Sequence, residues 1–132
     1  MRLVFDTNIL ISATGWEGSV AEKLILKIIE HGLKVFVSQE ILAEFHKVLV
    51  RDFDYTPNQA TEKIEGITSL FTIVEPVERV LAVAADPSDN KIIECALACS
   101  ADCIITYDKH LLDIKEFRGI KIIKPEEALR LL

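Results

Sequence analysis

Hydrophobic residues along the 132-residue chain fall into two alternating patterns. Short apolar runs such as RLVF, LKVFV and DCIIT have the length of buried strands. Between these runs, apolar residues recur every three or four positions, as in VAEKLILKIIEH, which is typical of helices with one buried face. The alternation predicts an α/β fold in which a mostly parallel sheet carries helices on both faces.

Cap and turn residues indicate where these elements begin and end. Ser38 is a good N-cap for a helix, Gly32 is a good stop, and Pro57 suits a first helical turn. Thr7 and Asn8 are expected to turn the chain out of the first strand into a loop that contains Trp16. The predicted strands are residues 2–5, 33–37, 71–76, 102–106 and 120–123, and the predicted helices are residues 19–31, 38–50, 56–70, 80–85, 86–101 and 125–132, with a short turn or helix at 107–113.

Composition and charge narrow the classes of protein. Half of the residues are apolar and 27% are charged, which is typical of one globular domain covering residues 1–132. No run approaches the roughly 20 apolar residues of a membrane span, and the start has no signal-peptide pattern, so we expect a cytoplasmic protein. The net charge of −6 disfavours non-specific binding to duplex nucleic acid, which is usually electrostatic.

Three cysteines, Cys95, Cys99 and Cys103, have the spacing C-x3-C-x3-C. An odd number of cysteines without a secretion signal argues against a disulfide framework. Cys95 and Cys99 share one face of a predicted helix, and Cys103 opens a predicted strand. We therefore expect all three to pack as small hydrophobic residues rather than to bind zinc or carry redox chemistry.

Two aspartates follow predicted strands directly. Asp6 ends the first strand, and Asp108 lies just beyond DCIIT. The carboxyl ends of parallel strands meet at one edge of a sheet, where ligands bind in this class of fold. If the two strands are neighbours, the two carboxylates lie close together. Each aspartate also suits a helix N-cap or a turn, and Thr7 or Asn8 could cap in place of Asp6.

Two further acids have helical positions that reach the same edge. Glu44 lies at the margin of the apolar face of its helix, one turn from the start, whereas Glu40 and Lys47 point to the wet face. In the segment DPSDN, Asp86 is the expected N-cap, and Asp89 follows three residues later, where an acid can reach back to the cap N–H. Asp89 can serve that cap or a metal, and the sequence leaves both roles open.

Four carboxylates at one edge would repel one another and would lose solvation, at a cost of several kcal/mol. A hard divalent cation such as Mg²⁺ or Mn²⁺ removes that cost because it prefers oxygen ligands. Such a centre supports phosphoryl-transfer chemistry by activating water and stabilising charge on phosphate oxygens. The sequence therefore predicts a metal site built from Asp6, Glu44, Asp89 and Asp108.

Three segments, LVFDTNILISA, VSQEILAEFHKVL and DPSDNKIIECALACSADCIITYDKHLL, span almost the whole chain. In order and spacing they resemble PIN-domain ribonucleases, particularly the small prokaryotic VapC-like group of toxin–antitoxin systems. The resemblance implies a three-layer α/β/α sandwich with about five strands. It also implies metal-dependent hydrolysis of single-stranded RNA, assembly into homodimers or larger oligomers, and often an antitoxin partner.

Carried over by position, the acidic quartet of the resembled family falls on Asp6, Glu44, Asp89 and Asp108. The resemblance gives Asn8, Thr106 and Asp86 supporting roles. Substrate-contacting residues are not fixed by these motifs. Four cations close to the acids in sequence are candidates to meet RNA phosphates, although each also fits a plain solvated charge: Lys47, Arg51, Lys91 and Lys109. Trp16 could stack on a base, anchor its loop or lie in an interface.

Two alternative functions remain at this point. The first is a catalytically weak PIN-like module that binds RNA or protein without cutting. The second is another α/β protein with an acidic pocket, such as a receiver domain or an aspartate-nucleophile phosphatase. The second alternative fits poorly, because a receiver needs an acid pair near the first strand and the phosphatase pattern D-x-D would need an acid where this chain has Asn8.

Overall fold

In residues 1–83 and 86–132, which the computed structural model describes, six strands form one sheet in the order β3-β2-β1-β4-β6-β5. Neighbouring strands are parallel except β5, which runs antiparallel to β6. The strands are β1 (Arg2–Phe5), β2 (Lys34–Ser38), β3 (Thr72–Val74), β4 (Cys103–Ile105), β5 (Glu116–Phe117) and β6 (Ile120–Ile123). This arrangement confirms the predicted mostly parallel sheet, and the short β5 adds one strand to the expected five.

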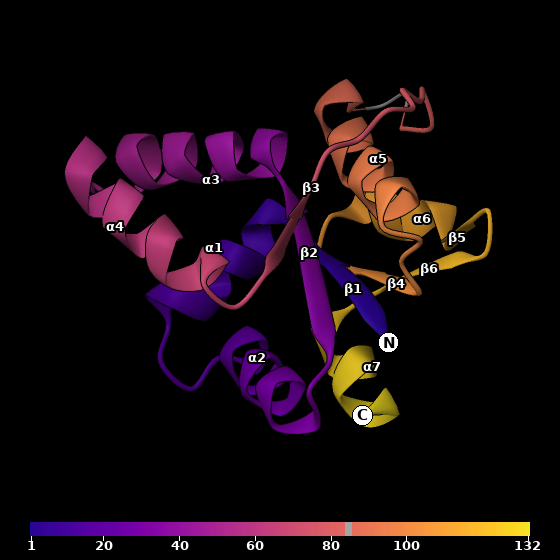
Figure 1. Cartoon of the computed structure of the whole chain (residues 1–132), viewed down its shortest axis with the longest axis horizontal. Helices are drawn as coiled ribbons and strands as arrows, with labels where there is room; N and C mark the ends of the chain where they lie inside the picture. Colours follow the sequence, from indigo (N-terminus) through magenta and orange to yellow (C-terminus); the bar gives the residue numbers. More distant parts are fainter. Residues whose placement is uncertain (84–85) are drawn as a thin grey trace.

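Helices cover both faces of the sheet (Figure 1). The helices are α1 (Thr7–Gly15), α2 (Val20–His31), α3 (Gln39–Asp52), α4 (Pro57–Thr68), α5 (Asn90–Ala98), α6 (Lys109–Ile114) and α7 (Pro125–Leu131), with a 3₁₀ turn η1 at Pro87–Asp89. Figure 1 shows α1 to α4 on one side of the sheet and α5 and α6 on the other. Right-handed crossovers explain this division, because the chain moves outward in opposite directions from β1 and from β4.

Strands β1 and β4 form the centre of the sheet. The three residues at the end of β1, Leu3, Val4 and Phe5, are almost completely buried, as expected for a strand covered on both faces. Phe5 is the partner of Ile105 at the carboxyl end of β4, and the Asp6 amide donates to the Ile105 carbonyl at 3.0 Å. The topology changes direction between these two strands, so their carboxyl ends border the crevice where ligands bind in such sheets.

Most predicted helix limits are confirmed by their caps. The Ser38 hydroxyl accepts a hydrogen bond from the Ile41 amide at the start of α3. Gly32 ends α2 in the left-handed conformation with φ 64°, which glycine adopts without steric cost. Thr56 caps α4, and Pro57 and Pro125 occupy first helical positions. The residue patterns that predicted these caps therefore describe local hydrogen bonds correctly.

Two predicted segments were wrong, and the helix predicted over 86–101 with Asp86 as its cap instead spans Asn90–Ala98, after the 3₁₀ turn η1. Residues 7–15 form helix α1 rather than a turn and loop, and the cap is Asp6 rather than Thr7 or Asn8. The predicted helix at residues 80–85 is absent over 80–83, and residues 84–85 lie outside the described part of the chain. Val80 and Val83 instead donate their amides to side chains of α5.

All three cysteines are buried and free, in agreement with the packing prediction. Burial raises the pKa of the Cys95 thiol to about 12 and also raises those of Cys99 and Cys103. Such thiols remain protonated and unreactive near neutral pH. Within residues 1–83 and 86–132, no helix combines the length and the apolar character needed to cross a membrane.

Candidate metal centre

Asp6 connects β1, α1 and β4. Its Oδ1 accepts a hydrogen bond from the Thr7 amide at 2.7 Å, so the side chain caps α1. Its Oδ2 accepts from the Thr106 hydroxyl at 2.6 Å. The carboxylate is buried, and the two donors fix its orientation at the carboxyl edge of the sheet.

Asp108 approaches the same place from β4. Its Oδ1 caps α6 by accepting the amides of His110 and Leu111, as the N-cap interpretation predicted. The Thr106 hydroxyl that donates to Asp6 also accepts the Asp108 amide at 2.9 Å. One buried threonine therefore fixes the relative position of the two aspartates.

Asp86 and Asp89 complete a cluster with Asp108. One carboxylate oxygen from each of the three lies within 4.8 Å of the others. Asp86 Oδ1 accepts from both the amide and the hydroxyl of Ser88. The Asp89 side chain makes no cap hydrogen bond, and its buried Oδ2 has no partner among the described residues. The local capping role open to Asp89 is thus absent, and the side chain faces the other acids.

The electrostatics of the cluster favour a proton or a cation. Burial raises the pKa of Asp89 to about 7, and the negative charges of Asp108, Asp6 and Asp86 add to this effect. Burial likewise raises the pKa of Asp6 to about 6, against the lowering effect of its hydrogen bonds from Thr106 and Thr7. Raised pKa values from crowded carboxylates are typical of functional sites.

Glu44 lies beside this cluster but is held by other partners. Its Oε2 accepts the Thr7 hydroxyl at 2.7 Å, and its Oε1 lies 3.0 Å from Lys91 Nζ. The charge of Glu44 nevertheless contributes to the raised pKa of Asp6, so the two carboxylates are near each other. Lys91 is only 16% exposed, and its ammonium neutralises the one acid of the predicted quartet that comes from α3.

The residues present fit a divalent cation with oxygen ligands. Three carboxylates face one another, and the unpartnered buried Oδ2 of Asp89 offers a lone pair that no protein donor uses. Asn8 has a similar carbonyl oxygen, Oδ1, that is buried without a partner among the described residues. Mg²⁺ and Mn²⁺ bind carboxylate and amide oxygens of this kind and retain water at other positions.

Comparison with known proteins identifies the family to which this fold and these motifs belong. A model of the PIN domain family matches residues 2–110. This chain belongs to the PIN domain family. The matched range contains Asp6, Glu44, Asp86, Asp89 and Asp108. The PIN domain is also 29% identical to the uncharacterized protein MJ1680 of Methanocaldococcus jannaschii over 120 residues, which are 88% of this chain and 76% of that protein.

Solved structures share the fold at lower sequence identity. PAE2754 from Pyrobaculum aerophilum aligns with a TM-score of 0.68 and 19% identity, over 99% of this chain and 89% of that one. VapBC-1 from nontypeable Haemophilus influenzae gives 0.68 and 20%, over 96% and 99%. VapBC2 from Rickettsia felis, bound to a DNA fragment from their promoter, gives 0.64 and 15%, over 92% and 97%. The PIN domain thus has the fold of these proteins.

The other candidate cations are not members of the acidic cluster in the PIN domain. Arg51 is exposed and forms an ion pair with Asp52 at 2.8 Å. Lys47 and Lys109 are exposed to solvent. The structure brings Asp6, Asp89, Asp108 and Thr106 together and adds Asp86 as a full member of the cluster.

Sequence reasoning missed the parts played by Thr7 and Ser88. Thr7 was expected only to turn the chain, yet its hydroxyl ties Glu44 to α1. Ser88 orients Asp86 with two donors. The available signal was adjacency, because each residue lies within two positions of a candidate acid.

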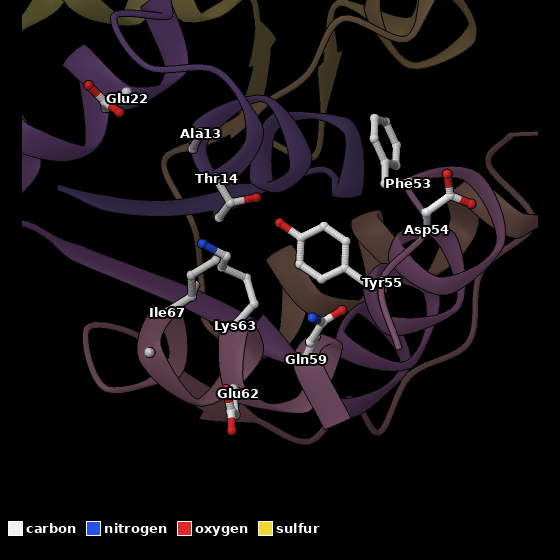
Figure 2. Close-up of a pocket in the computed structure, with 11 residues that line it drawn as sticks. Ala13, Thr14, Glu22, Phe53, Asp54, Tyr55, Gln59, Glu62, Lys63 and Ile67 are labelled. Carbon is white, nitrogen blue, oxygen red and sulfur yellow. The ribbon is translucent and has the colours of Figure 1, made fainter. Parts of the chain in front are cut away.

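A groove of about 920 Å³ lies apart from the cluster, between α1 and α4. Figure 2 shows Tyr55 and Lys63 pointing into it towards Thr14. Three acids and one lysine line this groove, together with apolar and small side chains, and none of the predicted site residues does so. Trp16, 52% exposed, packs edge to face on Phe53, which also lines the groove. The groove and the acidic cluster are therefore separate features of the PIN domain.

Proposed function

We propose that this PIN domain is a divalent-metal-dependent endoribonuclease that hydrolyses single-stranded RNA. The observation that carries the proposal is the cluster of Asp86, Asp89 and Asp108 within 4.8 Å, with Asp6 oriented beside it by Thr106. These four aspartates would hold Mg²⁺ or Mn²⁺. The resemblance to PIN-domain ribonucleases supports the same reaction, in the cytoplasm that the sequence predicts.

Each part of the site has a role in this proposal. A bound cation would lower the pKa of a coordinated water and stabilise negative charge on the scissile phosphate. Thr106 keeps Asp6 and Asp108 in register, so the ligand oxygens are positioned before the cation arrives. Lys91 balances Glu44, which limits the repulsion that an approaching phosphate would meet.

The direct test is cleavage of a mixed single-stranded RNA pool by the purified protein. We expect cutting with Mg²⁺ or Mn²⁺ and none with EDTA. The variant Asp89→Asn keeps the size of the side chain but removes its charge, and should lower cleavage by more than about 100-fold. Asp113→Asn, at an exposed acid on α6, is the matched control and should cut like the wild type.

Two results would contradict the proposal. One is cleavage that survives EDTA. The other is an Asp89→Asn variant with wild-type activity. A wild-type protein that binds RNA in Mg²⁺ or Mn²⁺ without cutting it would instead support the alternative of a catalytically weak binding module.

We also propose a small protein partner, as in a toxin–antitoxin pair, that occupies the groove between α1 and α4. The fold shared with the VapBC structures and the resemblance to VapC-like proteins of toxin–antitoxin systems support this proposal. The groove has acids Glu22, Asp54 and Glu62 against Lys63, with the exposed aromatic residue Trp16 beside it. This chemistry fits an amphipathic helix with basic flanks.

The partner test uses the small protein encoded beside the gene, if it co-purifies with the chain. Ala13→Arg places a bulky cation in the groove and should weaken binding at least about tenfold, through both volume and charge. Cleavage of RNA without the partner should not change. Ala98→Arg, at an exposed residue at the end of α5, is the control. Equal partner binding by both variants would contradict the proposal that the partner occupies the groove.

A further inference from the structure

Residues 75–83, here called the strap, connect β3 to η1 and form neither helix nor strand. In Figure 1 the strap runs from the end of β3 across to the α5 side of the sheet. Two of its apolar side chains, Val77 and Leu81, are 93% and 91% exposed. Val80 and Ala82 pack only partly against the core before the buried Val83, so polar contacts also contribute to fixing the path of the strap.

Two buried polar residues of α5 supply those contacts. Glu94 accepts the Val80 amide at 3.0 Å and the Arg79 guanidinium at 2.8 Å. Asn90 Oδ1 accepts the Val83 amide at 2.8 Å. Asn90 and Glu94 are four residues apart, so they lie on the same face of the helix, one turn from each other. Each of the two side chains therefore holds one strap amide, Glu94 that of Val80 and Asn90 that of Val83.

The bond between Val83 and Asn90 closes a short loop. Residues 83–90 contain both Asp86 and Asp89, two of the three acids in the cluster. Asp89 is directly followed by α5, so the helix itself places it. Asp86 is farther from the helix, and its position also depends on the path of the strap that precedes it. This bond therefore limits the positions that Asp86 can take relative to α5.

From these contacts we propose that Asn90 and Glu94 are positioning residues, which anchor the strap and thereby place Asp86 in the acidic cluster. Neither side chain is a ligand in the proposed site. The Arg79 ion pair is the weaker part of the anchor, because Arg79 is largely exposed and water screens its charge. The two backbone amides, bonded to buried acceptors, are the stronger part.

Measuring cation affinity tests this inference only if the proposed metal site exists, because the inference rests on the proposed function there. The experiment therefore adds hydrogen exchange, which needs no cation. Hydrogen exchange of the cation-free protein reports the Ser88 and Asp89 amides, which bond to Asp86. Calorimetry with Mg²⁺ or Mn²⁺ reports affinity. The variants are Asn90→Ala and Glu94→Ala, with Glu94→Gln as the conservative change, since an amide oxygen can still accept the Val80 amide.

Two controls separate positioning from general loss of stability. Glu40→Gln removes the exposed partner of Arg79 and leaves both strap amides bonded. Thr56→Ala removes the cap of α4, which lies outside the cluster. It destabilises the protein without touching the strap, and so controls for a general loss of stability in the alanine variants. Both should keep wild-type exchange at Ser88 and Asp89 and wild-type cation affinity.

We expect Asn90→Ala and Glu94→Ala to speed exchange at Ser88 and Asp89 and to weaken cation binding at least tenfold, with partial rescue in Glu94→Gln. Unchanged exchange in both alanine variants would overturn the inference, and so would wild-type cation affinity in variants whose exchange is faster. If the wild type binds no cation, the proposed function fails. Exchange at the two amides then decides the role of Asn90 and Glu94 by itself.

Discussion

Asp89 is the residue on which local structure and proposed chemistry diverge most clearly. Its position three residues after Asp86 suits a helix cap, yet the side chain makes no cap bond and buries an oxygen without a partner. A buried polar atom without a partner costs roughly 1–3 kcal/mol, so folding alone gives no reason to keep it. Under the proposed function, a cation would use that oxygen.

The raised pKa values predict that the cation-free protein loses stability as pH rises. Asp6 and Asp89 titrate near pH 6 and 7 in the folded protein but near 3.8 in the unfolded chain. The folded state therefore binds more protons between pH 4 and 7, and their contribution to stability, complete below pH 3.8, is lost as pH passes through 6 and 7. Each proton contributes up to about 1.4 kcal/mol per pH unit.

Urea unfolding in EDTA between pH 4.5 and 8 measures this effect. In the Asp89→Asn variant the pH-dependent loss should be clearly smaller, and Mg²⁺ should restore the wild type more at pH 8 than at pH 5. If the wild type and the variant show the same pH profile, Asp89 is not under the electrostatic strain described above.

Strand ends made Asp6 and Asp108 predictable as neighbours, because parallel strands present their carboxyl ends together. Which other acids join the cluster was harder to predict from the sequence. Asp86 reaches it through a 3₁₀ turn, which has no periodic sequence signal. The pairing of Lys91 with Glu44 joins two helices that are adjacent only because β2 and β4 flank β1. Contacts of this kind depend on the tertiary arrangement, which no local pattern encodes.

At the scale of elements, caps account for the helices that the sequence predicted well. The α4 cap is a complete capping box: Thr56 Oγ1 accepts the Gln59 amide, and the Gln59 side chain accepts the Thr56 amide. Because the partners are three residues apart, the pattern is visible without knowledge of the fold. The same box fixes the start of the helix that lines one side of the groove.

Thr56→Ala should destabilise the protein by about 1 kcal/mol, because two amides at the start of α4 lose their partners or their geometry. Thermal or urea denaturation measures the change. Asn58→Ala, an exposed position in the same first turn, is the control and should stay within about 0.5 kcal/mol of the wild type. A loss of the same size in both variants would show that the cap is not the cause.

The elements that were predicted wrongly lacked such local signals. Helix α1 buries Thr7, Ile9, Leu10 and Ile11, which lie around much of its circumference, so no amphipathic period stands out. The strap overlaps the helix predicted at residues 80–85. Its amides instead bond to Asn90 and Glu94, and this long-range partnership decides its conformation.

For the whole molecule, the order of the strands predicts where the structure opens first. β1 and β4 each have a strand on both sides and are buried, whereas β3 lies at one edge and has an exposed residue, Ile73. Hydrogen exchange should therefore be slowest at Val4 and Ile104, through global unfolding, and faster in β3 and β5. Exchange in β3 as slow as in β1 would contradict this view of the sheet.

Asp6 has a consequence for the choice of reagents. Its carboxylate caps α1 and accepts from Thr106, and asparagine is as good an N-cap as aspartate. Asp6→Asn can therefore remove a charge from the site and keep the cap of α1, although its amide nitrogen cannot accept the Thr106 hydroxyl. Under the proposed function, such a protein would bind its RNA without cleaving it. Crosslinking the variant to RNA in cells would then recover the natural targets.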